Sequence, residues 1–279
     1  MPIQKRDANL DIFPAVLEHN HTHVSIGDIH GNALKLIYTL IEEGVLTLDK
    51  DQYEQIRDIY KTPVGNLTKE QIETFESIIA KAGVNDQRAI TLIGDELADR
   101  GNNDYFTLLV LKKLREANVD MDVMISNHSM EFIKDYERVS FTGQYNLGRG
   151  QGASLANMSV LIKKGLVQED DVRHIVDFCY KSIVKAIGYT LSEEGQITLF
   201  SHAPIGLETV EALANKFKIP YKDATPKELF SIIDAINETV RTKFTNKELT
   251  AMLREEGHGS SVLPIPMSKP LKRLDGIVL

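Results

Sequence analysis

Five short apolar runs of β-prone residues recur along the chain, and each ends in small or polar residues. Runs of this kind are typical of buried strands. After the first two runs, apolar residues repeat at helical spacing, over 34–41 and over 106–114. A strand–helix–strand–helix–strand order predicts an open α/β sheet with helices packed on it. The five runs are 24–26, 89–93, 123–125, 197–200 and 277–279.

Capping signals predict further helices outside this alternation. Thr68, Thr225 and Thr245 each precede Gln or Glu by three residues, which is the spacing of a capping box. The first of them lies in a segment of about residues 45–88, which we expect to be a helical insertion. The glycine-rich stretch 141–154 is predicted to be a loop. Because no repeat or linker divides the chain, we expect residues 1–279 to form a single domain.

Composition excludes several classes of function. The chain has 32 Lys and Arg against 40 Asp and Glu, a net charge of −8, which argues against broad nucleic-acid binding. No run approaches the roughly 18 consecutive apolar residues of a membrane-spanning helix. Residues 1–17 carry acidic and polar breaks where a signal peptide is apolar. We therefore expect a cytoplasmic protein with no nucleic-acid partner and no integral membrane segment.

Carboxylate, imidazole and amide side chains follow four of the predicted strands. They lie in the segments 27–31, 94–101, 126–128 and 201–204. Because ligands collect at the carboxyl ends of strands in open α/β sheets, we expect these side chains to converge on one sheet edge. Oxygen and nitrogen donors without thiolate suit a divalent metal such as Mn, Fe or Zn. Asp28 and Asp95 are short carboxylates that can bridge two such ions.

These segments resemble successive motifs of the calcineurin-like metallophosphoesterases, and among them the PPP-type protein phosphatases. The family motifs are GD-x-HG, GD-x-x-DRG, GNHE and a later strand-borne HG or SH. Residues 27–31 and 94–101 resemble the first two, but Ser129 replaces the acid of the third, and the next acid is Glu131. The resemblance covers about residues 22–134 and 195–204. It implies an α/β fold, a layered sandwich of central β-sheets flanked by helices.

The resemblance also implies two divalent metal ions, most naturally Mn, with Fe or Zn as alternatives. Asp28 and His30 would bind the first metal, and Asp95 would bridge both. Asn127 and His202 would bind the second metal.

Three further residues would carry the catalytic steps. Arg100 would hold the phosphate oxygens, since its guanidinium fork suits a tetrahedral oxyanion. His128, oriented by Asp99, would donate a proton to the leaving group, because a nearby carboxylate favours imidazolium. Two cations lower the pKa of a bridging water enough to give hydroxide near neutral pH. The expected reaction is therefore hydrolysis of a phosphoprotein by direct attack of a metal-bridging hydroxide, with no covalent phosphoenzyme.

The last metal ligand has two candidate positions. The family takes it from a histidine just beyond a late strand, and residues 274–279 look like that strand. Either the natural chain continues to a histidine beyond Leu279, or His258 substitutes from a loop.

Two other functions are compatible with the sequence. One is a nucleotide or dinucleoside polyphosphate hydrolase, because a metal core alone does not choose a substrate. The other is an impaired pseudo-phosphatase that acts as a binding module, which the altered third motif allows. The insertion, that motif and the segment 201–204 are also similar to bacterial secreted-effector phosphatases of the Wip type, which would act inside a host cell. Phosphoserine, phosphothreonine and phosphotyrosine substrates all fit this sequence.

Overall fold

A four-stranded parallel sheet forms the centre of the computed structural model, which describes residues 8–18, 22–145, 151–193, 195–254 and 277–278. Its strands pair in the order β1, β4, β5, β6, with Val24 opposite Ile90 and Ile90 opposite Met121. These strands are His23–Ile26 (β1), Ala89–Leu92 (β4), Met121–Met124 (β5) and Val184–Lys185 (β6). The predicted α/β fold class is confirmed.

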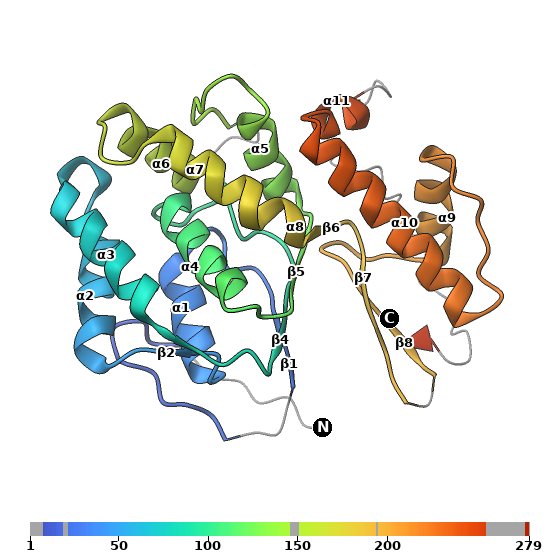
Figure 1. Ribbon diagram of the computed structural model, residues 1–279, viewed down its shortest axis with the longest axis horizontal. Helices are drawn as coiled ribbons and strands as arrows, with labels where there is room; N and C mark the ends of the chain where they lie inside the picture. Colours follow the sequence, from blue (N-terminus) through green and yellow to red (C-terminus); the bar gives the residue numbers. More distant parts are fainter. Residues whose placement is uncertain (1–7, 19–21, 146–150, 194, 255–276, 279) are drawn as a thin grey trace.

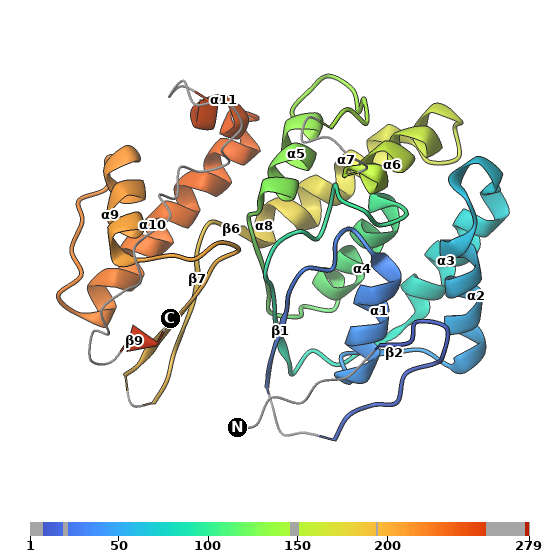
Figure 2. The same ribbon diagram turned by 180° about the vertical axis from the view of Figure 1, so that it is seen from behind.

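Helices cover one side of this sheet, with α4 buried at their centre (Figures 1 and 2). Asn32 and Asn103 cap α1 and α4, because each side chain accepts a hydrogen bond from a backbone N–H of the first turn. The helices of this layer are Ala33–Glu42 (α1), Asp104–Glu116 (α4), Asn127–Tyr136 (α5), Ala153–Lys163 (α6), Glu169–Ile175 (α7) and Lys181–Ile183 (α8). A π-helical segment, Val176–Tyr180 (η2), joins α7 to α8.

Residues between α1 and β4 form a helical hairpin that packs against α4. Capping boxes begin both of its long helices, at Asp49 and at Thr68. Phe75 stacks on Phe106 with ring centroids 4.2 Å apart, which holds the hairpin to α4. The elements are Leu46–Thr47 (β2), Lys50–Lys61 (α2), Val64–Asn66 (η1), Lys69–Lys81 (α3) and Gly83–Val84 (β3), with β2 and β3 antiparallel.

A second, three-stranded sheet lies on the other side of the parallel sheet and carries its own helices (Figures 1 and 2). β8 pairs antiparallel with β7 and parallel with β9. The elements are Gly188–Leu191 (β7), Ile197–Phe200 (β8), Ile277–Val278 (β9), Leu207–Lys216 (α9), Pro226–Thr245 (α10) and Leu249–Arg254 (α11). The order helices, sheet, sheet, helices is the layered sandwich that the sequence predicted.

Two details of the second sheet differ from the sequence-based expectations. The strands at 197–200 and 277–278 belong to this sheet and not to the one that contains β1. The helix start predicted at Thr245 is wrong, because Thr245 is the last residue of α10.

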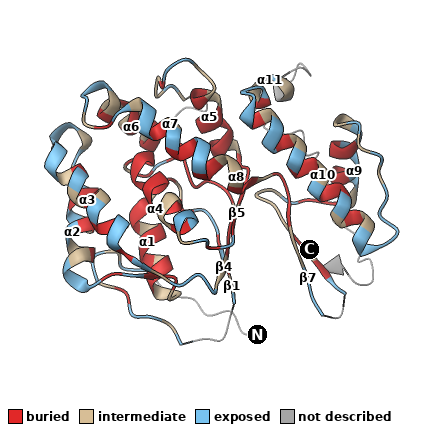
Figure 3. Ribbon diagram, viewed as in Figure 1, coloured by how far each residue is buried: buried red, intermediate tan, exposed pale blue. Residues whose placement is uncertain are grey.

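Buried side chains gather on the strands and on the inner faces of the helices, while the outer faces of α2, α3 and α10 are exposed (Figure 3). Among the described residues, no helix combines the length and the apolar character that crossing a membrane requires.

Candidate active site

The chain turns sharply after β1 and after β4. Asp28, His30 and Asp95 have φ angles of 46°, 57° and 55°, a region that residues other than glycine rarely occupy. Backbone hydrogen bonds hold the two turns together, from Gly31 N to Asp95 O at 3.1 Å and from Gly101 N to His30 O at 2.7 Å. Such conformations cost on the order of 1–3 kcal/mol each and cluster at functional sites. This edge of the sheet is therefore a candidate functional site.

Asp95 is shared by two groups of side chains that lie close enough together to hold a metal ion. Ligand atoms of Asp28, Asp95 and His202 lie within 4.8 Å of one another, and so do those of His30, Asp95 and Asp99. Asp95 Oδ1 is buried without a hydrogen-bond partner, and the His202 Nε2 atom lies 3.5 Å from it. A buried carboxylate oxygen in this state is costly unless a cation neutralises it. The residues present therefore fit a divalent metal ion, and Asp95 is common to both groups.

Hydrogen bonds fix the orientation of both candidate histidine ligands. The Nδ1–H of His202 donates to the Ile93 carbonyl at 2.9 Å, and the Nδ1–H of His30 donates to Asp99 Oδ2 at 2.6 Å. Histidine ligands of metals almost always donate their other N–H group to a carbonyl or a carboxylate in this way. For His202, Nε2 is the nitrogen that faces Asp95, at 3.5 Å, whereas the nitrogen of His30 nearest to Asp95 is Nδ1, at 4.0 Å.

Only glycine fits at position 94, directly before Asp95. The φ of Gly94 is +77°, and a Cβ atom there would lie 2.6 Å from His202 Nδ1 and 2.8 Å from the Cβ of Ser126. No side chain fits between these groups. The absence of a side chain at position 94 lets His202, which follows β8 of the second sheet, reach the loop after β4, so candidate ligands from two sheets meet at one place.

The predicted proton donor, His128, is buried in the first turn of α5. Its Nδ1–H donates to the Ala98 carbonyl at 2.9 Å, and its Nε2 atom lies 3.7 Å from Asp99 Oδ2. Asp99 is thus closer to His30 than to His128. The carboxylate lies between both imidazoles, whereas the sequence predicted a role toward His128 alone.

Arg100 and Asn127 flank this group. The Arg100 side chain is 61% exposed and its Nε donates to Asp99 Oδ1 at 3.3 Å, so its guanidinium lies at the surface beside the acidic residues. Asn127 is the first residue of α5, directly after the N-cap Ser126 and before His128. His258 and Leu279, the two positions named for the last ligand, lie outside the described residues.

The loop after β4 is one residue longer than the motif that it resembles. Glu96, Leu97 and Ala98 separate Asp95 from Asp99, where GD-x-x-DRG has two residues. Ala98 has a φ of 54°, and its N–H donates to both carboxylate oxygens of Asp104, at 3.1 and 3.0 Å. A buried carboxyl in α4 therefore stabilises the turn that the additional residue creates.

Asp104 makes a pH effect measurable. Burial raises its pKa from 3.8 to about 7. Because folded Asp104 holds a proton that the unfolded chain has lost, its contribution to the free energy of unfolding falls as pH rises through this range. Asp104→Asn should make the fall shallower by up to about 1.4 kcal/mol per pH unit. Urea unfolding at several pH values from 4 to 7 measures the slope, and an identical slope in the variant would show that Asp104 ionises normally.

Sequence reasoning missed Tyr145, whose hydroxyl is hydrogen-bonded to His128 Nδ1. The two rings stack with centroids 5.5 Å apart and an interplanar angle of 23°. Gly152 makes room for the phenol, since a Cβ there would lie 2.3 Å from Tyr145 Cγ. An aromatic residue within a glycine-rich loop was the only signal in the sequence. Sequence reasoning also missed a hydrogen-bond network formed by Ser126, Ser129, Glu96 and Tyr180.

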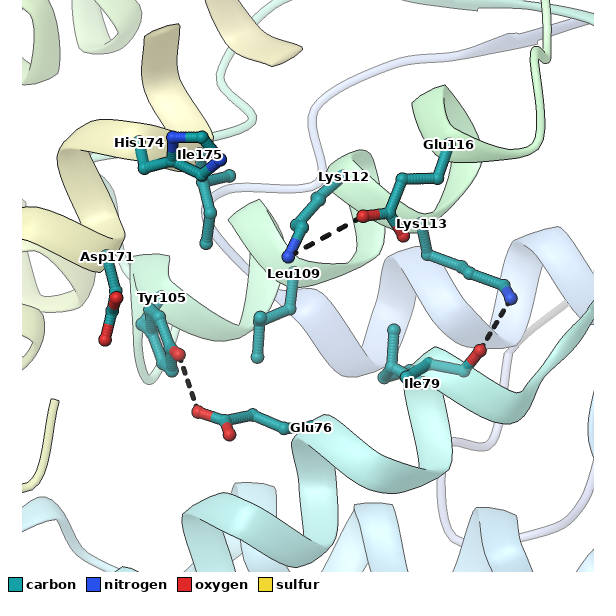
Figure 4. Close-up of a pocket in the computed structure, with 11 residues that line it drawn as sticks. Glu76, Ile79, Tyr105, Leu109, Lys112, Lys113, Glu116, Asp171, His174 and Ile175 are labelled. Carbon is teal, nitrogen blue, oxygen red and sulfur yellow. Dashed lines mark hydrogen bonds and ion pairs between the residues drawn. The ribbon is translucent and has the colours of Figure 1, made fainter. Parts of the chain in front are cut away.

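A separate cavity of about 270 Å³ lies between α3, α4 and α7 (Figure 4). Its polar side chains pair largely with the protein itself. Tyr105 donates to Glu76 at 2.6 Å, Lys113 donates to the Ala80 carbonyl at 2.7 Å, and Lys112 lies 3.6 Å from Glu116. With most of its charges already paired, this cavity offers less to a phosphate or a metal than the edge at Asp95.

Comparison with known proteins identifies two similarities. Residues 89–274 match the family described as WipA-like, phosphatase domain. The crystal structure of the phosphatase domain from the Legionella effector WipB is similar to this one, with a TM-score of 0.76 and 30% sequence identity over 83% of each chain. No curated protein matches the sequence. The family match contains Asp95 and His202 but begins after Asp28 and His30.

Proposed function

This chain belongs to the family of WipA-like phosphatase domains, and on that premise we propose that it is a metal-dependent phosphoprotein phosphatase. It hydrolyses phosphomonoesters directly, without a covalent phosphoenzyme. The observation that supports the metal dependence is Asp95, whose buried Oδ1 lacks a hydrogen-bond partner and whose carboxylate belongs to both ligand groups.

The ligand groups suggest two divalent ions, with Mn²⁺ as the first candidate. By the family motifs, Asp28, His30 and Asp95 would hold one ion, and Asp95, Asn127 and His202 the other. The ligand-atom distances instead group Asp28 with Asp95 and His202, and His30 with Asp95 and Asp99. Asp99 is hydrogen-bonded to His30 and lies in the same group. Divalent cations bound there would supply charge that neutralises the phosphate oxygens and would activate water as a nucleophile.

The remaining steps belong to side chains of this protein. Arg100, exposed beside Asp99, binds the non-bridging oxygens of the phosphate with its guanidinium fork. His128 gives a proton to the leaving oxygen, and Asp99 favours the protonated imidazole. Tyr145 covers the same imidazole and limits its contact with water.

The site of action is inferred from the similar structure. WipB is a Legionella effector. We propose that this chain is likewise delivered into a host cell and acts on phosphoproteins there.

Metal removal tests the proposed function directly. After chelation and dialysis, turnover of phosphopeptides should fall to the background rate, because the proposed metal ions would activate the attacking water. Addition of Mn²⁺ should restore it, and elemental analysis before and after should follow the activity. Full turnover by metal-free protein would refute the proposal, and bound metal without any turnover would instead favour a binding module.

A further inference from the structure

Glu96, the residue after Asp95, is a completely buried carboxyl that no basic side chain contacts within the described residues. Both of its oxygens lie 3.0 Å from Ser129 Oγ, which donates to them, and the Tyr180 hydroxyl donates to Oε1. Ser129 and Tyr180 are buried as completely as Glu96. A buried carboxyl is retained only where donors satisfy it, so these two hydroxyls have a specific function here.

The hydrogen bonds of Ser129 continue back to Asp95. Ser129 Oγ lies 2.8 Å from Ser126 Oγ, and Ser126 Oγ accepts from the backbone N–H groups of Asp95 and Ser129, both at 3.0 Å. The bonds form a closed ring that starts and ends at residues 95–96. Asn127 and His128 lie between the two serines, so the ring includes the turn that carries them.

We propose that Glu96 and Tyr180 are positioning residues that hold the first turn of α5, with Asn127 and His128, in a fixed place relative to Asp95. This role rests on the proposed function, because it concerns a second metal ligand and the proton donor. It also accounts for the altered third motif. The acid that the motif has at position 129 is supplied here by Glu96, opposite the Ser129 hydroxyl. Glu131, the next acid in the sequence, pairs instead with Lys134 at 3.2 Å.

Aromatic packing holds the Tyr180 side chain so that its hydroxyl reaches Glu96. Tyr180 ends the π-helical segment η2, a conformation that occurs often at functional sites. Its ring meets Phe132 of α5 and Phe244 of α10 edge-on, with centroids 5.6 and 6.1 Å away. Removing the hydroxyl alone therefore leaves the aromatic packing in place.

The test compares Tyr180→Phe with Tyr53→Phe by calorimetric titration with Mn²⁺. Tyr53 is equally buried, and its hydroxyl donates to the Leu10 carbonyl at 2.9 Å, in the N-terminal segment. Loss of an outer partner of a metal site typically costs about 10–100-fold in metal affinity or activity. Because Tyr180 acts through Glu96 and Ser129, Tyr180→Phe should lose Mn²⁺ affinity and kcat at the low end of this range, by about 10-fold. Tyr53→Phe should bind Mn²⁺ like the wild type despite a similar fall in melting temperature.

Two substitutions of Glu96 test whether its hydrogen-bond acceptors are what matters for Mn²⁺ affinity. Glu96→Gln keeps an oxygen that accepts from Ser129 and Tyr180, whereas Glu96→Met removes both acceptors at similar size. The glutamine variant should therefore retain more Mn²⁺ affinity than the methionine variant. Equal, wild-type affinity in Glu96→Met and Tyr180→Phe would overturn the proposal and leave the network a purely stabilising one.

Hydrogen exchange separates this proposal from the proposed function. In metal-free protein, the backbone amides of residues 127–131 should exchange faster in Tyr180→Phe than in the wild type. In Tyr53→Phe their exchange rates should equal those of the wild type. Unchanged exchange in Tyr180→Phe would refute the positioning role. A wild type that binds Mn²⁺ without hydrolysing any phosphopeptide would refute only the proposed function, because the affinity and exchange comparisons do not depend on turnover.

Discussion

Asp95→Asn is expected to lower phosphatase turnover by more than about 100-fold and to weaken Mn²⁺ binding at both positions. Loss of an outer partner of a metal ligand already costs about 10–100-fold. Asp95 belongs to both ligand groups, so its neutral amide removes one negative charge from each. The carboxylate and the amide have nearly the same shape, and the fold should persist. Steady-state kinetics and calorimetric titration with Mn²⁺ measure the two effects.

Asp122→Asn is the matched control for this substitution. Asp122 lies on β5 of the same sheet, and its carboxylate pairs with Lys185 Nζ at 2.7 Å, away from the ligand groups. The control should bind Mn²⁺ and turn over substrate like the wild type. If Asp95→Asn also kept wild-type turnover, the bridging role of Asp95 would be wrong.

Local signals in the sequence were sufficient for the main strands and for several helix ends. β1, β4 and β5 are short apolar runs, and residues 27 and 94 that follow two of them are glycines at turns. Thr68 and Thr225 cap α3 and α10 as predicted, because a hydroxyl that bonds to the first turn depends only on neighbouring residues. These features need no knowledge of distant contacts.

Pairing between distant strands was beyond such signals. The run 197–200 pairs with β7, whose Tyr189 and Thr190 are only partly buried and gave no strand pattern. His202 consequently reaches Asp95 from a second sheet and not from the same one. The sequence named both residues, but the path that joins them depends on the packing of two sheets.

Side-chain partners were the least predictable part of the site. Asp99 approaches His30 as well as His128, and the loop that carries it has one residue more than the motif and a positive φ at Ala98. Glu96 and Tyr180 are far apart in the sequence and meet only in the buried interior. Contacts of this kind follow from the folded core, so neither motif spacing nor periodicity indicates them.

His128→Asn is expected to lower kcat by about 10²–10⁴-fold on a phosphoserine peptide, the range typical of general acid–base groups. Asparagine retains an N–H group for the Ala98 carbonyl but cannot carry the proton, so Mn²⁺ binding should be nearly unchanged. An activated aryl phosphate has a leaving group that needs little protonation, so the fall in kcat on that substrate should be much smaller. Equal losses on the two substrates would show that His128 is not the acid.

Asp99→Asn should behave differently from His128→Asn, because Asp99 contacts two imidazoles. Its carboxylate lies 3.7 Å from His128 Nε2, so turnover of the unactivated substrate should fall in the same direction. It also accepts the 2.6 Å hydrogen bond of His30, so Mn²⁺ affinity should fall by about 10–100-fold as well. Turnover measured at saturating Mn²⁺ separates the two contributions. If affinity stayed at the wild-type value while turnover fell, Asp99 would act through His128 alone, and its bond to His30 would contribute nothing to metal binding.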